Sequence, residues 1–282
     1  MASLRDRGNV ALHLAKLNAI RKHRTRHHQA AIYLHPELGN VLVLNGEIQH
    51  VEAWAPLYHE PLVHLAAAYT RSPKTALILG GGSFFAAKEV LKYASIKRVL
   101  MLDHDKEVCD LVSETYSHAA EVRQDVRLEL HYEDAFQTLE STNDRFDLIV
   151  NDSVDLLRRD GAGAFGLLGA RLSRGGVCSD VIYRHIFAGS HAAQSFRLLQ
   201  QEYRIAASMI FVPEYPGVMH VLTLWGTGRF LVQTLRKPRN LEQQMWCRSP
   251  NRNPCLYYDP RFLSYYLHLP PYLRRQIKEK LD

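Results

Sequence analysis

Uninterrupted apolar runs recur through the middle of the chain and are separated by amphipathic stretches. The first two, Thr75–Leu79 and Arg98–Leu102, flank a stretch from about Phe84 to Tyr93 that has the length and composition of a helix. Continuous apolar runs around a helix are typical of parallel strands that are covered on both faces. We therefore expect a parallel β-sheet flanked by helices.

Five more strands are expected after this pair: Val126–His131, Phe146–Val150, Val177–Ile182, Ala206–Val212 and Val218–Trp225. The last two are joined by the tight turn Glu214–Gly217, which makes them an antiparallel pair. A parallel sheet that closes with such a pair is typical of the methyltransferase-type sheet of seven strands. The predicted fold class is therefore α/β.

Before residue 57 the pattern changes twice. Residues 1–28 carry an imperfect apolar stripe with basic residues towards the end, which predicts an amphipathic helix. Short β-rich runs follow, and Asn45-Gly46 between two of them is a strong hairpin signal. We expect a basic N-terminal helix (1–28), a small antiparallel β-domain (29–56) and a large α/β domain (57–282) whose Tyr-rich C-terminal tail packs on its body.

The composition is that of a globular protein, with 46% hydrophobic and 23% charged residues among 282. No apolar run reaches the roughly 18 to 20 residues of a membrane span, and the N-terminus lacks an apolar signal-peptide core. The four cysteines are scattered without ligand spacing. We therefore expect a reduced, cytoplasmic setting with no structural zinc and no membrane partner.

The formal charge of +6 owes much to basic runs near the two ends, of which Arg21–His28 is the first. Such runs occur in nucleic-acid-binding proteins. This run, however, has no interleaved aromatic residues on which bases could stack. We interpret it as a solvated helix end and do not expect a nucleic-acid partner.

Glycine and aspartate residues follow the predicted strands at the edge where open α/β sheets bind ligands. The glycines Gly80–Gly82 follow the first strand, Asp103 ends the second, Asp134 follows the third, and Asp152 and Asp155 follow the fourth. Glycines let a backbone approach a ligand, and a carboxylate about 20 residues further on can accept both ribose hydroxyls. Each aspartate alone is more often a helix cap or turn residue, but the row as a whole predicts an adenosine ligand. The absence of a GxxxxGK[ST] loop argues against a triphosphate.

A series of short segments completes this picture: GNVLVLNGEIQ, YHEPLVHLA, ALILGGG, LDHD, VRLELHYEDAFQTL, FDLIVNDSVD, EYPGVMHV and the tail YYDPRFLSYYLHLPPYLRR. In order and spacing they resemble the spermidine synthases, the polyamine aminopropyltransferases, over about residues 30–275. The resemblance implies a small N-terminal β-domain followed by a Rossmann-like domain, and we expect a homodimer. It also implies transfer of an aminopropyl group from decarboxylated S-adenosylmethionine to an amine, with release of methylthioadenosine.

The resemblance implies a role for each residue that matches a family motif. The donor-binding residues would be Gln49, Gly80, Gly81, Gly82, Ser83, Asp103, His104, Asp134, Ala135 and Asp152. Asp152 matches the family's general base and Asp155 a carboxylate that anchors the acceptor amine, while Tyr58 and Tyr215 would line the aminopropyl and acceptor channel. No metal is expected.

The chemistry explains why such residues are needed. A sulfonium donor is already activated, so the protein must supply alignment. It must also remove a proton from the acceptor, because an ammonium group with a pKa near 10 is not a nucleophile. A carboxylate can take that proton, and aromatic faces can steady the cationic centres.

Two segments depart from the family pattern. Its glycine loop GGGDGG reads GGGSFF here, so Ser83 replaces the carboxylate that holds the ammonium of the decarboxylated donor. The loss also removes a repulsion against a donor that keeps its carboxylate, so intact S-adenosylmethionine becomes a second candidate donor, unless another acid has taken over the role. After Asp152, Arg158-Arg159 would attract an anionic acceptor such as a modified peptide or nucleotide amine if these side chains face the site.

The sequence leaves three functions open. The first is transfer of an aminopropyl group, or of a 3-amino-3-carboxypropyl group from intact S-adenosylmethionine, to a nitrogen acceptor. The second is S-adenosylmethionine-dependent N-methyl transfer, and the third is nucleoside binding without turnover. The retained Asp152, Asp155, Tyr58 and Tyr215 favour the first.

Overall fold

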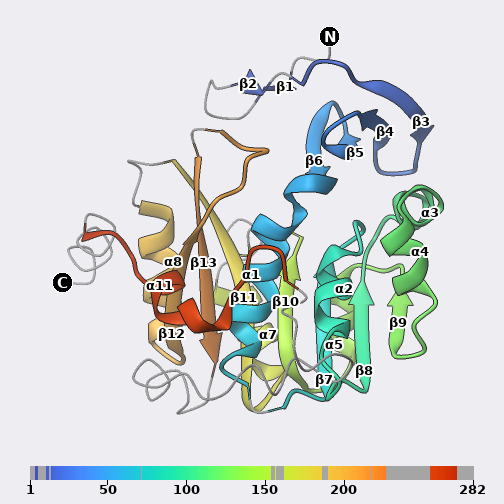
Figure 1. Ribbon diagram of the computed structural model, residues 1–282. Coiled ribbons are helices and arrows are strands. Elements are labelled where there is room, and N and C mark those ends of the chain that lie inside the picture. The colour runs from blue at the N-terminus through green and yellow to red at the C-terminus, as the bar shows by residue number, and fades with distance from the viewer. Residues whose placement is uncertain are drawn as a thin grey trace.

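The computed structural model describes residues 4–5, 11–12, 14–70, 72–153, 156, 162–185, 190–216, 218–226 and 255–271. Its main body is a seven-stranded sheet with the order β12-β13-β11-β10-β7-β8-β9 (Figure 1). The strands are β7 (Thr75–Gly80), β8 (Arg98–Leu102), β9 (Leu128–His131), β10 (Phe146–Asp152), β11 (Leu172–His185), β12 (Arg204–Ile210) and β13 (Val218–Gly226). Strands β7 to β11 pair in parallel, and β13 is antiparallel to β11 and β12. The predicted α/β class, the seven strands and the antiparallel last pair are confirmed.

Helices cover both faces of this sheet (Figure 1). They are α1 (Ala55–Ala67), α2 (Phe85–Leu91), α3 (Lys106–Thr115), α4 (Ser117–Arg123), α5 (Ala135–Ser141), α7 (Ala162–Ala170) and α8 (Ser190–Gln200). The central strand β7 shows why its run is apolar throughout: Ala76 and Ile78 pack with α1 to α4, whereas Leu77 and Leu79 pack with α5, α7 and α8. Among the helices of the described residues, none is long and apolar enough to span a membrane.

The N-terminal sheet includes a strand, β3, that lies within the segment predicted as a helix. Strands β3 (Asn18–Arg24), β4 (Gln29–His35), β5 (Gly39–Leu44) and β6 (Glu47–Val51) form an antiparallel sheet in sequence order, and the Asn45-Gly46 hairpin is confirmed. The predicted helix over residues 1–28 is wrong for Asn18–Arg24, because this segment pairs with β4. Every side chain of β3 is exposed, whereas Leu12, Leu14 and Leu17, which belong to the predicted apolar stripe, pack against the core of the N-terminal sheet. Two short strands, β1 (Leu4–Arg5) and β2 (Ala11–Leu12), precede it.

The basic run after β3 joins the two sheets. The Thr25 hydroxyl donates to Asp105 Oδ2 at 2.6 Å, and His28 Nδ1 lies 2.7 Å from the same oxygen. Asp105 also caps α3 by accepting from the Val108 N–H. The N-terminal sheet is thereby held beyond the carboxyl ends of β7 and β8 (Figure 1), where the ligand of an open α/β sheet binds.

The described part of the C-terminal tail packs on the body of the large domain, as predicted, and it does so against α1. It contains η3 (Pro260–Phe262) and α11 (Leu263–Tyr266). The buried carboxylate of Glu60 accepts three successive backbone N–H groups of the tail, from Leu256 and Tyr257 at 2.8 Å and from Tyr258 at 2.7 Å. This carboxylate therefore fixes the tail against the helix that also carries Tyr58.

Candidate active site

A cleft of about 740 Å³ lies between the carboxyl edge of the large sheet and the β5–β6 hairpin. It is lined by all but one of the side chains and glycines that the sequence predicts: Gln49, Tyr58, Gly80, Gly81, Gly82, Ser83, Asp103, His104, Asp134, Ala135, Asp152 and Tyr215. Asp155 and the Arg158-Arg159 pair lie outside the described residues. The structure thus brings together predicted residues from seven separate segments.

The glycine turn allows β7 to approach β10. Gly80 and Gly81 have φ of +73° and +90°, a region that residues with a side chain rarely adopt. A Cβ on Gly80 would lie 2.7 Å from Ser153 Cβ and 2.9 Å from the carbonyl oxygen of Asp152. These positions therefore need glycine in order to place the turn beside Asp152.

The rest of the turn is uncharged and is backed by aromatic rings. The Ser83 carbonyl accepts from His118 Nε2 at 2.9 Å, and Phe84 is fully buried with a φ of +63°. The Phe85 ring packs on His118 and His50, with ring centroids 3.7 and 4.4 Å apart. Burial lowers the pKa of His118 to about 4, so this imidazole is neutral at pH 7.

Two predicted ligand carboxylates are oriented by backbone N–H groups. Asp103 Oδ1 accepts from the Asp105 N–H at 2.9 Å, and burial raises the pKa of Asp103 although this hydrogen bond opposes the shift. Asp134 caps α5 by accepting from the N–H groups of Phe136 at 2.9 Å and Gln137 at 3.1 Å. Both carboxylates line the cleft, as an adenosine site requires, and their contacts with adenosine stay a prediction.

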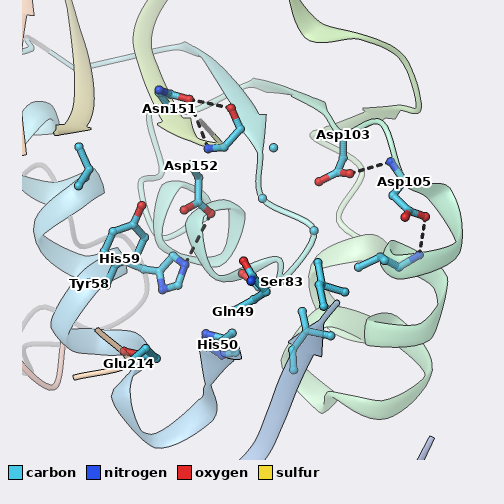
Figure 2. A pocket seen from close by; sticks show the side chains of 18 of the residues that line it. Gln49, His50, Tyr58, His59, Ser83, Asp103, Asp105, Asn151, Asp152 and Glu214 are labelled. Atoms are coloured by element: carbon cyan, nitrogen blue, oxygen red, sulfur yellow. Dashed lines mark hydrogen bonds and ion pairs between the residues drawn. The ribbon is translucent and has the colours of Figure 1, made fainter. Parts of the chain in front are cut away.

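Asp152 lies at the end of β10, next to Gly80 in the register of the sheet. Its carboxylate is 3.6 Å from His59 Nε2, and the two side chains are only 9% and 7% exposed (Figure 2). Burial lowers the pKa of His59, but the charge and hydrogen bond of Asp152, together with the backbone of Ala55 and the charge of Glu214, outweigh it, and the net shift is upward. Burial, followed by the charge and hydrogen bond of Asp152, raises the pKa of Tyr58 well above its usual range. The carboxylate of Asp152 therefore faces two side chains that can donate a proton to it, those of Tyr58 and His59.

Several cleft residues are not among those predicted from the sequence. Asn151 donates to Asp180 at 2.7 Å and accepts from the Ser153 hydroxyl at 2.9 Å, which shapes the turn that presents Asp152. His50, His59 and Glu214 also line the cleft. Each stands next to a predicted residue (Gln49, Tyr58 and Tyr215), so proximity along the chain was the available signal.

A second buried polar cluster lies between α1 and α2. His64 Nε2 is 2.8 Å from Glu89 Oε2, and Lys92 forms an ion pair with the same oxygen. Burial alone would raise the pKa of Glu89, but His64 and Lys92 lower it to about 2. In the described part of the chain, His64, Glu89 and Cys255 form the group whose spacing could hold a metal ion. The Glu89 oxygen of this group is already ion-paired. The expectation that the protein needs no metal stays a prediction.

The mixed sheet with one reversed strand, the glycine turn after its central strand and the carboxylates at the neighbouring strand ends define an α/β protein of the methyltransferase type. The model of the spermine/spermidine synthase domain matches residues 55–234. The chain therefore belongs to the spermine/spermidine synthase family.

Curated relatives match over part of their length. The thermospermine synthase ACAULIS5 of Arabidopsis thaliana is 39% identical over 117 residues, which are 42% of this chain and 34% of that protein. The polyamine aminopropyltransferase 1 of Pseudomonas aeruginosa is 34% identical over 139 residues, which are 49% of either chain. The chain thus spans half or less of the length of these two relatives.

Solved structures match over nearly the whole chain. The spermidine synthase from Thermotoga maritima superimposes with a TM-score of 0.83 and 21% identity, covering 98% of this chain and 93% of the other. A spermidine synthase in complex with the transition state analogue AdoDATO gives the same TM-score and identity, with coverages of 99% and 94%. These likenesses show that the fold is shared.

Proposed function

We propose that the protein transfers an aminopropyl-type group from an S-adenosyl donor to an amine and releases methylthioadenosine. The position of Asp152 carries this proposal. Its carboxylate lies beside the glycine turn, 3.6 Å from His59, in a cleft that Tyr58 and Tyr215 also line. The names of the curated relatives, thermospermine synthase and polyamine aminopropyltransferase, support the same reaction class.

In this proposal the donor lies along the carboxyl edge of the sheet. Asp134 takes the adenine amine, Asp103 the ribose hydroxyls, and the turn Gly80–Gly82 passes the sulfonium. Asp152 accepts a proton from the acceptor ammonium. The neutral nitrogen then attacks the carbon next to the sulfonium sulfur, a C–N bond forms, the C–S bond breaks, and its electron pair stays on the sulfur of methylthioadenosine.

The choice of donor depends on Ser83. The turn presents a hydroxyl backed by Phe85 and the neutral His118 where the resemblance places a carboxylate. The ammonium group on the donor's propyl chain has no carboxylate partner at this turn, and the carboxylate of an intact donor meets no repulsion from the turn. We therefore propose that intact S-adenosylmethionine is accepted, with transfer of its 3-amino-3-carboxypropyl group. Transfer of an aminopropyl group from the decarboxylated donor follows the same steps.

Product analysis tests this proposal. The protein is incubated with either donor and a panel of amines, and the nucleoside products are separated by chromatography. Methylthioadenosine that appears only with an acceptor supports propyl-type transfer, and adenosylhomocysteine would identify a methyltransferase. Neither product with any amine would identify a binding protein and overturn the proposal. The homodimer and the cytoplasmic location stay predictions.

A further inference from the structure

Glu214 is a carboxylate at the cleft with one oxygen unsatisfied. It lies in the turn between β12 and β13 and lines the cleft. One oxygen, Oε1, accepts from the Val51 N–H at the end of β6, at 3.2 Å. The other, Oε2, is shielded from solvent and has no hydrogen-bond partner among the described residues. An unsatisfied buried carboxylate oxygen is costly, so it calls for a proton or a cationic partner.

The surroundings of Glu214 favour a ligand cation. Figure 2 shows it on the Tyr58 side of Asp152, away from Asp103 and the predicted adenosine site. Burial raises the pKa of Glu214, the backbone hydrogen bonds oppose the shift, and the nearby His59 opposes it further. His59, however, is already paired with Asp152 at 3.6 Å. A cation that enters this end of the cleft can therefore satisfy Glu214 without breaking an existing pair.

We infer that Glu214 is a specificity-determining residue that binds a second ammonium group of the acceptor, so that diamines are preferred over monoamines. The inference rests on the proposed function, because it takes the reacting amine to lie at Asp152. The terminal torsion of a glutamate is soft, so a small rotation presents an oxygen to the ligand while the other keeps the Val51 N–H. An ammonium group is protonated at pH 7 and supplies the donors that this oxygen lacks.

The amide variant Glu214→Gln separates this role from a structural one. Its side-chain oxygen still accepts the Val51 N–H, so the link between the turn and β6 is kept, while the negative charge is lost. Glu47→Gln is the matched control, since Glu47 lies at the rim of the same cleft but is exposed on β6. Thermal unfolding confirms that both variants fold, and Glu214→Asp, which keeps the charge, serves as the conservative variant.

The first measurement is calorimetric binding of linear α,ω-diamines of increasing length, and of the corresponding monoamines, to the protein saturated with methylthioadenosine. Glu214→Gln should weaken diamine binding at least about tenfold, the loss expected for one hydrogen bond to a charged group. It should change monoamine binding and methylthioadenosine binding less than about twofold. Glu214→Asp should restore part of the diamine affinity, and Glu47→Gln should behave as wild type.

The second measurement is the KM of each amine in the transfer assay, which should rise for diamines with little change in kcat. If Glu214→Gln weakens the binding of monoamines and diamines equally, or weakens only donor binding, the inference is overturned and Glu214 is a structural or donor-binding residue. Failure of the proposed function would look different: wild type would release no methylthioadenosine, while the calorimetric comparison would still report on Glu214. Wild-type diamine and monoamine affinities that are equal would also overturn the inference.

Discussion

Removal of the Glu60 carboxylate should detach the C-terminal tail from α1. In the folded protein this buried carboxylate accepts the N–H groups of Leu256, Tyr257 and Tyr258 at 2.7 to 2.8 Å. Glu60→Ala leaves these three donors without a protein acceptor. Because α1 also carries Tyr58 and His59, the change links tail docking to the geometry of the cleft.

The magnitude follows from the three hydrogen bonds. A hydrogen bond to a charged group contributes roughly 1.5 to 3 kcal/mol. The full sum is not lost, because the tail can detach and water can then satisfy its N–H groups. The loss of unfolding free energy therefore cannot exceed the free energy of tail docking. Removal of one partner of a buried charged contact typically costs about 3 to 5 kcal/mol. We expect the lower end, about 3 kcal/mol, which lowers the Tm by roughly 5 to 10 °C in a domain of this size.

Urea and thermal unfolding followed by circular dichroism measure this loss directly. Limited proteolysis is the second assay, because a detached tail should be cleaved faster near Cys255, which is 9% exposed in the folded protein. The matched control is Glu47→Ala, which removes an exposed carboxylate and should change stability by less than about 0.5 kcal/mol. A loss below about 1 kcal/mol for Glu60→Ala, with unchanged proteolysis, would refute the reasoning and show that the apolar contacts of the tail suffice to dock it.

Four further outcomes are expected. Asp103→Ala should weaken methylthioadenosine binding by about 1.5 to 3 kcal/mol in calorimetry, and unchanged affinity would exclude Asp103 as the ribose ligand. Asp152→Asn should lower turnover roughly 10²- to 10⁴-fold with little change in donor affinity, and surviving turnover would mean that the proton goes elsewhere. Ser83→Asp should weaken binding of intact S-adenosylmethionine more than that of its decarboxylated form. If wild type already prefers the decarboxylated donor and the variant leaves both dissociation constants unchanged, this prediction is wrong. The pKa of Glu89 is lowered from 4.5 to about 2, so the ionised side chain contributes about 3 kcal/mol to the free energy of unfolding above pH 4.5. This contribution is lost as the pH falls towards 2. In urea titrations, Glu89→Gln should therefore flatten the fall of stability with falling pH, and an unchanged pH dependence would count against the ion pair.

The large sheet could be predicted from the sequence because its signals are local. A strand must be apolar at each position that is buried, and β7 and β8 meet that condition at residues 76–79 and 99–102. The row of cleft residues could be predicted for the same reason, since the residues that follow parallel strands meet at one edge of the sheet. Asp103 and Asp152 are placed in this way, by the ends of β8 and β10.

The first strand of the N-terminal sheet could not be predicted by this reasoning. An edge strand with all side chains exposed has no required alternation of polar and apolar residues, so Asn18–Arg24 satisfies a weak helical pattern equally well. Its strand conformation comes from pairing with β4, and its position comes from the contacts of Thr25 and His28 with Asp105, 80 and 77 residues away. Contacts at such separations leave no periodic signal in either segment.

The same reason explains why Glu214 and His59 were not predicted as site residues. His59 lies in α1 and Glu214 in the predicted turn, and each segment is explained without a functional role. What distinguishes them is a relation between distant elements: His59 reaches Asp152 across the cleft, and Glu214 accepts from Val51 163 residues earlier in the chain. A carboxylate in a turn is ordinary until the turn is seen to close a cleft and to leave one oxygen without a partner among the described residues. The features that we propose for the selection of the amine therefore lie in contacts between segments, whereas the residues of the predicted adenosine site are recognisable from the chain itself.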